Sequence, residues 1–238
     1  MDSLLALIIT YNPDADFFTH LPLFRAEFSH TLIVDNHSLK EIREKLAHAE
    51  SDRLTVLANA ENLGVATALN QGFGWALAHG FTHVLTFDQD STPKENTVNV
   101  LQKVLAQHST ENLAIVASVI NDAQVNKTAR FLVPRNKWRF AWQFCEGEML
   151  ENLSFAITAG SLCSLAVYQD IGRFEDGFFI DYVDKEYGLR ANLKGYKIIA
   201  ACDAYLNHRL GEREKRRLLG YNHYPTFHSP LRWYYIAR

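Results

Sequence analysis

The chain has 238 residues, 47% of them hydrophobic, and a formal net charge of −3 at pH 7. This length allows one large α/β domain with a sizeable core, and a single domain is the simpler prediction. A slightly acidic chain has no overall attraction for nucleic acid, so any basic surface must be local. The apolar stretch 4–9 is too short to span a membrane and lacks the features of a signal peptide, which predicts a first strand in a cytoplasmic protein.

The first half of the chain alternates predicted strands with predicted helices. The strands are expected at residues 4–10, 31–34, 54–57 and 84–87. Asn12 and Pro13 are expected to begin the first helix, and a capping box of Ser38 and Glu41 begins the second. A third helix, starting near Gly64, carries an apolar stripe at helical spacing. This alternation predicts parallel strands joined by right-handed crossovers, as in a nucleotide-binding sheet.

The second half departs from this rhythm. Thr92, Pro93 and Glu95 form a capping-box pattern that begins a helix ending near Gln107. The remaining predicted elements are a strand at 113–118, a β-hairpin or irregular sheet at 128–144, a strand at 161–168, a helix at 182–193 and strands at 197–201 and 204–208. Residues 229–238 are expected to be the start of an amphipathic helix that is cut short.

The cysteines, Cys145, Cys163 and Cys202, are widely separated in the sequence. Their spacing matches neither a disulfide framework nor a metal-binding knuckle. We therefore expect unpaired, buried side chains in a protein from a reducing compartment.

The run 84–90 ends in two carboxylates, Asp88 and Asp90, directly after the fourth predicted strand. Open α/β sheets bind ligands beyond the carboxyl ends of their strands. Two carboxylates separated by one residue can bind a hard divalent cation together with substrate phosphates. The alternative is that Asp90 caps the following helix, although the pattern at Thr92 already supplies a cap. Both interpretations stay open on this pattern alone.

Several short motifs follow one another along nearly the whole chain. They are residues 10–12, 34–38, 62–64, 70–72, 87–90, 159–161 and 178–186, and His208 with Gly211. In this order they resemble the inverting glycosyltransferases of family 2, which have the GT-A fold. The resemblance implies a Rossmann-like, mostly parallel central sheet flanked by helices, with a smaller mixed sheet. It also implies one domain, with a nucleotide-binding half at 1–118 and an acceptor-binding half at 119–238.

Within this family, the chain is most similar to bacterial rhamnosyltransferases that build cell-surface polysaccharides. The similarity lies in residues 179–184 and in the tail 228–236. It implies L-rhamnose as the transferred sugar and dTDP-rhamnose as the nucleotide-diphosphate donor.

The resemblance also implies which groups hold the donor. Tyr11 can stack on a pyrimidine, and Asp35 can accept a hydrogen bond from the ring N3–H. The alternative for Asp35 is a turn aspartate, although Ser38 is expected to serve as the cap. For Asn62 and Asn70 the alternatives are a helix cap and a polar helix face. The other implied donor-site residues are Thr10, Asn12, Asn36, Gly64, Asp88, Gln89, Gly160 and Ser161.

For the metal, the resemblance implies that Asp90, and Asp88 directly or through water, hold Mg or Mn against both phosphates. Such a cation acts as a Lewis acid for the departing diphosphate. His208 is the candidate for a further ligand. The alternative is a structural histidine, because a hard cation tolerates imidazole without requiring it.

Inverting transfer to a sugar hydroxyl needs a carboxylate base. Counting back from Arg190, the resemblance assigns this role to Asp184, with Asp181 as the alternate base. The competing interpretation is a capping pair, with Asp181 as N-cap and Asp184 as the third helical residue. At such a position the helix dipole is expected to lower the pKa of Asp184. Glu186 and Arg190 are spaced to form an ion pair.

Two stretches bear on the acceptor, which the resemblance makes a lipid-linked glycan or a polysaccharide. The basic residues in 209–217 could meet a lipid diphosphate or an anionic leaflet at the inner face of the plasma membrane, or could form a solvated loop. Trp138, Phe140, Trp142 and Phe144 alternate and therefore line one face of a strand. Ordinary sheet packing is the alternative to sugar binding for these aromatics.

Two other functions were weighed against a transferase. A nucleotidyltransferase uses a similar sheet and metal but needs a basic, glycine-rich first loop, and residues 10–13 contain no basic residue. A catalytically silent nucleotide-sugar-binding module has no use for a base. The joint presence of Asp88, Asp90 and Asp184 therefore favours an enzyme.

Overall fold

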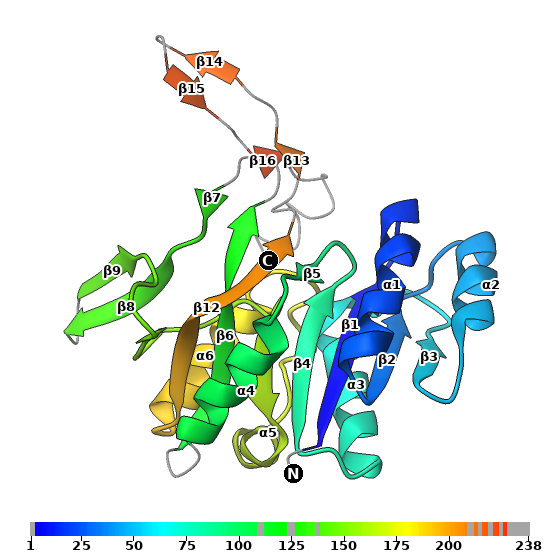
Figure 1. The fold of residues 1–238 in the computed structure, drawn as a ribbon, viewed down its shortest axis with the longest axis horizontal. Helices are drawn as coiled ribbons and strands as arrows, with labels where there is room; N and C mark the ends of the chain where they lie inside the picture. The colour runs from blue at the N-terminus through cyan, green and yellow to red at the C-terminus, as the bar shows by residue number, and fades with distance from the viewer. Residues whose placement is uncertain are drawn as a thin grey trace.

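A central sheet with helices on both faces forms the body of the molecule (Figure 1). The computed structural model describes residues 3–108, 112–122, 127–136, 139–208, 212–213, 216–218, 221–223 and 226–227. The helices of this part of the chain are α1 Ala15–Glu27, α2 Lys40–Ala49, α3 Gly64–Ala78, α4 Thr97–Gln107, α5 Leu165–Ile171 and α6 Val183–Leu193. Its strands are β1 Leu4–Thr10, β2 His30–Asp35, β3 Leu54–Ala58, β4 His83–Asp88, β5 Thr92–Pro93, β6 Leu113–Asp122, β7 Lys127–Thr128, β8 Phe131–Asn136, β9 Arg139–Gln143, β10 Met149–Leu150, β11 Ser161–Ser164, β12 Lys197–His208, β13 Glu212–Arg213, β14 Arg216–Leu218, β15 Tyr221–His223 and β16 Thr226–Phe227.

The main sheet is mixed, with the strand order β10-β12-β6-β11-β4-β1-β2-β3. Strands β1 to β4 run parallel, and so do β6 and β12. Strand β11 runs antiparallel between β4 and β6, and short β5 and β7 pair with β12 and β6. The predicted α/β class and the parallel first half are confirmed. The described residues also form three two-stranded sheets, which are β8 with β9, β13 with β16, and β14 with β15.

Both faces of the main sheet are buried, which explains why its strands are continuously apolar. Successive residues of β1 alternate between two core clusters, because side chains of a strand point to opposite faces. One cluster contains residues of α3, α5 and α6, and the other contains residues of α1, α2 and α4. The helices therefore form one layer on each side of the sheet, and loops at the carboxyl ends of the strands are left to build a site.

The start of the first helix differs from the prediction. α1 begins at Ala15 with Asp14 as its N-cap, whose Oδ1 accepts a hydrogen bond from the Phe17 backbone at 3.2 Å. Asn12 instead lies in a turn with φ of 51° and accepts a hydrogen bond from the Leu39 backbone at 2.7 Å. Asn12 thus connects two loops rather than capping the helix that follows it.

The two capping boxes expected at Ser38 and at Thr92 are also wrong. α2 begins at Lys40 without a side-chain cap, because the Ser38 hydroxyl donates to Asp35 instead. α4 begins at Thr97, and the segment Thr92–Pro93 is not a helix start but strand β5, which pairs with the end of β12. A long-range strand pair therefore replaces the local cap.

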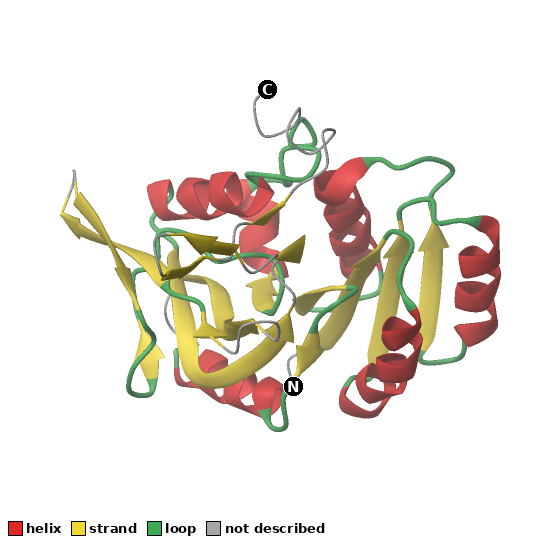
Figure 2. Ribbon diagram, turned by 90° about the horizontal axis from the view of Figure 1, so that it is seen from above, coloured by secondary structure: helices red, strands yellow, loops and turns green. Residues whose placement is uncertain are grey.

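The second half contains two further differences. β11 ends at Ser164, which caps α5, so the strand predicted at 161–168 is part strand and part helix. The strands predicted at 197–201 and 204–208 are one strand, β12, whose register shifts between Ala201 and Tyr205. The predicted hairpin is confirmed as β8 and β9, and it projects from the end of the main sheet (Figure 2). Residues 229–238, expected to start a helix, lie outside the described residues.

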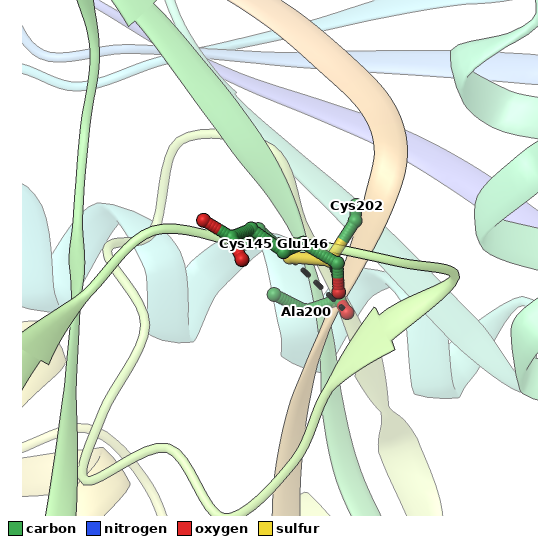
Figure 3. The surroundings of a disulfide bond; sticks show 4 residues. All are labelled: Cys145, Glu146, Ala200 and Cys202. Carbon is green, nitrogen blue, oxygen red and sulfur yellow. Dashed lines mark hydrogen bonds between the residues drawn. A yellow bond between two sulfur atoms is a disulfide. The ribbon is translucent and has the colours of Figure 1, made fainter.

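The expectation of unpaired cysteines is wrong for two of the three. Cys145 and Cys202 form a disulfide across 57 residues of sequence (Figure 3). The pairing of β10 with β12 brings the segment after β9 alongside Cys202, whose backbone donates to the Glu148 carbonyl at 3.0 Å. Cys163 is a buried free thiol, and burial raises its pKa to about 12. This proximity comes from sheet pairing, which cysteine spacing does not encode.

Among the described residues, no helix combines the length and apolar character needed to cross a bilayer.

Candidate active site

The carboxyl ends of three neighbouring strands meet at one edge of the sheet. Parallel pairing aligns Thr10 of β1 with Asp35 of β2, and Ile9 of β1 with Asp88 of β4. Acids from separate predicted strands are therefore brought to the same edge. In open α/β sheets this edge is where ligands bind.

Asp88, Asp90 and His208 form a cluster at this edge. Each offers one potential ligand atom, and these atoms lie within 4.8 Å of one another. His208 Nδ1 is 3.1 Å from Asp90 Oδ1, and His208 Nε2 is 3.8 Å from Asp88 Oδ2. The Asp88 and Asp90 side chains are 40% and 31% exposed, whereas that of His208 is 10% exposed. Two hard oxygen donors and one imidazole suit a divalent metal, so this group could hold one.

The unexpected strand β5 explains how His208 reaches the acids. β5 pairs Thr92 with Asn207, which places the end of β12 beside the residues that follow β4. The buried Ser91 hydroxyl lies 3.0 Å from His208 Nδ1 and fixes the ring on that side. Ser91 was not among the predicted site residues, although its place directly after Asp90 was an available signal. The misassigned cap at Thr92 is thus part of the structure that assembles the cluster.

The surroundings of His208 act on its protonation. Burial lowers the pKa of His208, but the hydrogen bond to Asp90 and the charges of Asp88, Asp90 and Asp122 outweigh burial and raise it. An imidazolium between carboxylates is stabilised in the same way as a bound cation. Metal binding at these atoms would therefore release a proton and weaken at low pH.

The loops after β1 and β4 are joined beside this cluster. The Tyr11 backbone donates to Gln89 Oε1 at 2.7 Å, and the Asn12 backbone donates to Ser38 Oγ at 2.7 Å. The Tyr11 ring is 50% exposed. Three of the predicted donor-site residues, Tyr11, Asn12 and Gln89, are therefore gathered at the edge that carries the acids.

Asp35 lies at the same edge but is fully buried, with 0% exposure. Its Oδ1 accepts hydrogen bonds from the hydroxyls of Thr10 and Ser38, and its Oδ2 accepts from the Ser38 backbone at 2.9 Å. This is the environment of a turn aspartate that orders two loops. A contact between Asp35 and a pyrimidine ring stays a prediction and would use the acceptor capacity left on this carboxylate.

Asn36 holds the start of α3. Its Nδ2 donates to the Gly64 carbonyl at 2.9 Å, and its Oδ1 accepts from the Leu63 backbone at 3.1 Å. Gly64 has φ of +82°, and a Cβ there would lie 2.5 Å from the Phe179 carbonyl oxygen. The Asn62 side chain accepts from the Gly64 backbone at 3.0 Å. These residues thus fix α3 against the segment that leads into α6.

Three other predicted donor-site residues lie in the packed interior. Asn70 is 4% exposed, and its amide makes hydrogen bonds with Tyr168, Phe174 and Asp176. Gly160 and Ser161 lie where β11 enters the sheet, and the Ser161 hydroxyl donates to the Ile157 carbonyl at 2.6 Å. The side chains of Asn70 and Ser161 are hydrogen-bonded within the protein, and Ser161 also lines the pocket that contains Asp184. Their donor contacts remain predictions.

Asp184 lines a small pocket beneath the same edge. The residues around this pocket are Thr86, Ile115, Ala156, Thr158, Ser161, Cys163, Phe174, Asp184 and Tyr187. Thr86 and Asp88 are two residues apart on β4 and so point to the same face of the sheet. The pocket that contains Asp184 therefore adjoins the face from which Asp88 projects.

The pKa of Asp184 is raised, contrary to the expectation from the helix dipole. Burial is the largest cause, and it outweighs the hydrogen bond from the Lys185 backbone at 2.8 Å. The charge of Asp181 acts in the same direction as burial. A raised pKa makes Asp184 a stronger base than an exposed aspartate.

The predicted capping pair of Asp181 and Asp184 is absent. Tyr182, with φ of 71°, is the N-cap of α6, and it provides no side-chain cap. The predicted ion pair is confirmed, because Arg190 Nε lies 2.7 Å from Glu186 Oε1. The Arg190 guanidinium also donates to the backbone carbonyls of Ile171 and Arg173. Arg190 thus ties α6, and with it Asp184, to the segment after α5.

The chain matches the family described as glycosyl transferase family 2 over residues 25–172. It belongs to this family and is a glycosyltransferase. It is also similar to the dTDP-rhamnosyl transferase RfbF of Shigella flexneri, with 28% identity over 235 residues, 98% of this chain and 77% of that protein.

Solved structures show the same GT-A fold. GalNAc-T7 with UDP, GalNAc and Mn2+ has a TM-score of 0.69 at 13% identity, covering 93% of this chain and 45% of that one. Residues 1–349 of Staphylococcus aureus TarS with UDP-GlcNAc have a TM-score of 0.60 at 16% identity, covering 89% of this chain and 60% of that one. The chain thus spans about half the length of these structures, and the likeness concerns the fold alone.

Proposed function

We propose that this chain transfers L-rhamnose, with inversion, from dTDP-rhamnose to a hydroxyl of a lipid-linked or polysaccharide glycan in a metal-dependent reaction. The observation that carries the proposal is the cluster of Asp88, Asp90 and His208 at the carboxyl edge of a GT-A sheet. The choice of donor is supported by the similarity to the dTDP-rhamnosyl transferase over 98% of the chain.

The donor lies along the loops after β1, β2 and β4 in this proposal. Tyr11 offers an exposed ring for stacking on the base, and its backbone is held by Gln89. Asp35 and Asn36 keep the neighbouring loops in place through their hydrogen bonds, and the pyrimidine contact of Asp35 adds specificity. A divalent cation held by Asp88, Asp90 and His208 would supply Lewis-acid stabilisation of the charge on the leaving diphosphate.

Asp184 serves as the base in this proposal. One of its carboxylate oxygens takes the proton of the acceptor hydroxyl while the acceptor oxygen bonds to the anomeric carbon. The bond from that carbon to the diphosphate oxygen breaks in the same step, and the diphosphate leaves on the opposite face. Burial raises the pKa of Asp184, which strengthens it for this transfer. Asp181 is the alternate base.

We place the protein at the cytoplasmic face of the membrane, where a lipid-linked acceptor would be reached. Disulfides are rare in the cytosol and persist in oxidising compartments. The Cys145–Cys202 bond predicts that these two cysteines carry no free thiol, whereas a cytoplasmic location predicts that both do. Alkylation of thiols in intact native cells, before lysis and purification, distinguishes them, because a cytoplasmic protein would keep both thiols reduced and accessible to the reagent after unfolding.

The test is transfer and thermal stability with a panel of nucleotide sugars, with and without Mn or Mg. We expect dTDP-rhamnose with metal to stabilise the protein, by about 2.7 kcal/mol at a ligand concentration 100 times the dissociation constant. Stabilisation by UDP-sugars but not by thymidine nucleotides would reject the donor. Full activity after chelation would reject the metal. Donor binding without transfer or donor hydrolysis would indicate a silent binding module.

A further inference from the structure

The β8–β9 hairpin has one buried face and one outward face. Its register pairs Leu132 with Trp142 and Pro134 with Phe140. Directly opposed residues of an antiparallel pair lie on the same face. The intervening residues Phe131 and Val133 are 9% and 8% exposed and belong to the core. The paired residues therefore form a second apolar face that points away from the core.

This outer face is exposed. The side chains of Phe140, Trp142 and Phe144 are each 54% exposed, and Pro134 is exposed as well. Figures 1 and 2 show the hairpin extending beyond the end of the main sheet. The expectation that these aromatics pack within a sheet is therefore wrong for the three that the structure describes. A contiguous group of exposed aromatics indicates an interaction surface.

The hairpin is also the most one-sidedly charged stretch of the described fold. Residues 127–145 contain five basic residues and no acidic residue, in a chain whose net charge is −3. They are Lys127, Arg130, Arg135, Lys137 and Arg139, of which Lys137 lies outside the described residues. Arg130 stands 5.8 Å from the ring centroid of Phe144. Arg130 thus lies beside the aromatic face, and Arg135 and Arg139 are exposed at the end of β8 and the start of β9.

The exposed aromatic residues and the basic residues together indicate which kind of partner binds the hairpin. A second copy of the chain would bring two equally basic hairpins together, and a neutral glycan would not use the charges. An anionic bilayer satisfies both features, since aromatic rings prefer the membrane–water interface and basic residues are attracted to anionic lipid. We propose that the β8–β9 hairpin docks the enzyme on an anionic phospholipid leaflet, with Phe140, Trp142 and Phe144 at the interface and the arginines at the headgroups.

The hairpin is attached to the rest of the protein by backbone hydrogen bonds at its buried side. The Leu132 carbonyl accepts from the Ser154 backbone at 2.8 Å, and the Ala129 backbone donates to the Ile120 carbonyl at 2.8 Å. The segment after β9 is held to β12 by the pairing of β10 with β12 and by the hydrogen bond from the Cys202 backbone to the Glu148 carbonyl at 3.0 Å, neither of which requires the disulfide. Substitutions on the outer face therefore leave the buried attachment of the hairpin unchanged.

The test is co-sedimentation of the purified chain with phosphatidylcholine vesicles, with and without phosphatidylglycerol. We expect binding only to the anionic vesicles, decreasing as added salt screens the charges. Arg135→Glu with Arg139→Glu removes two positive charges and adds two negative ones, so it should weaken binding by at least roughly 25-fold, at about fivefold for each positive charge lost. Phe140→Ser with Trp142→Ser should weaken it more than about tenfold. Thermal unfolding checks that each variant is folded. If the serine variant is unstable, the charge variant still tests the proposal, because it keeps the aromatic residues.

Two matched controls separate this surface from others. Leu193→Ser removes an 89% exposed apolar side chain on α6 and should leave vesicle binding unchanged. Arg216→Glu with Arg217→Glu reverses two charges of the second basic stretch and should change binding less than the hairpin variants. Loss of binding in that variant with retention in the hairpin variants would overturn the proposal, as would wild-type protein that ignores anionic vesicles.

A second copy is detected separately, by light scattering without vesicles. A dimer that dissociates on Phe140→Ser with Trp142→Ser, in a protein that ignores vesicles, would assign the face to self-association and overturn the proposal. Vesicle binding needs no nucleotide sugar. Its failure would therefore leave the proposed transfer reaction untouched.

Discussion

Asp35 and Asp88 end the two strands that flank β1, yet their carboxylates have opposite environments. Asp35 is fully buried and accepts three hydrogen bonds from Thr10 and Ser38. The Asp88 side chain is 40% exposed and shares a cluster with Asp90 and His208. A carboxylate whose acceptor sites are filled by the protein orders loops, whereas one facing a cleft is available to a ligand.

The same contrast separates Asn70 from Asp184. Asn70 is buried, and its amide is hydrogen-bonded to Tyr168, Phe174 and Asp176. Asp184 lines a pocket, and burial raises its pKa despite the opposing effect of Lys185. We therefore expect satisfied polar groups to fix the geometry of the site and the acids with unfavourable burial to take part in the reaction. Substitutions should separate the two kinds, since the first should lower stability and the second should lower activity.

Asp184→Asn should give the largest effect. It removes the proposed base while keeping the size of the side chain, so transfer should fall on the order of 100 to 10,000-fold. Donor affinity should be unchanged. Initial-rate transfer and donor titration measure the two quantities. Asp181→Asn is the matched control and should keep most activity; the reverse result would move the base to Asp181.

Asp90→Asn should give the next largest effect. Loss of one ligand charge weakens the stabilisation of the leaving group, so transfer should fall by about 100-fold or more. Stabilisation by Mn or Mg in a thermal-shift assay should disappear with it. Asp203→Asn, at an exposed acid of the same strand as His208, should keep both properties. Equal metal response in the two variants would show that the acids after β4 do not hold the cation.

Sequence patterns located the strands because a buried strand appears as a continuous apolar run in the local sequence. Four apolar runs of the first half became β1 to β4, and the polar residues after them reached one edge as parallel topology requires. The acids Asp88 and Asp90 were also found from their place after a strand, whereas the family resemblance supplied the candidate His208. The ordered set of short motifs supplied the family, which the match over residues 25–172 confirms.

Features that depend on distant pairing could not be predicted in this way. Thr92–Pro93 satisfies the local pattern of a helix start, yet β12 pairs with it and holds His208 against Asp90. Cys145 meets Cys202 only because β10 lies beside β12. Asp184 has a raised pKa because of burial, which the helix-dipole argument did not include. In each case a tertiary contact outweighs a local preference.

Asn70→Ala tests the expectation that a buried, fully hydrogen-bonded polar residue stabilises the fold. The substitution leaves the buried Tyr168 hydroxyl and Phe174 backbone without their partner, which should cost about 3 kcal/mol of unfolding free energy. Urea denaturation measures this change. Thr67→Ala, one turn earlier on α3, removes a more exposed hydrogen bond to Asp176 and should change stability by less than about 0.5 kcal/mol. Normal stability with lost donor affinity in Asn70→Ala would instead make Asn70 part of the donor site.

The smallest effect concerns the stability cost of Asp184 itself. Its folded pKa is raised above the unfolded value, so the folded state binds the proton more tightly and stability falls as pH rises through that window. The cost is complete above the folded pKa and absent below the unfolded value of about 3.9. Asp184→Asn should therefore melt at a higher temperature than wild type at neutral pH, and the difference should shrink as pH falls toward that value. A variant that melts lower at neutral pH would show that the Asp184 carboxylate stabilises the fold. Burial would then not raise the pKa of Asp184 or strengthen it as a base.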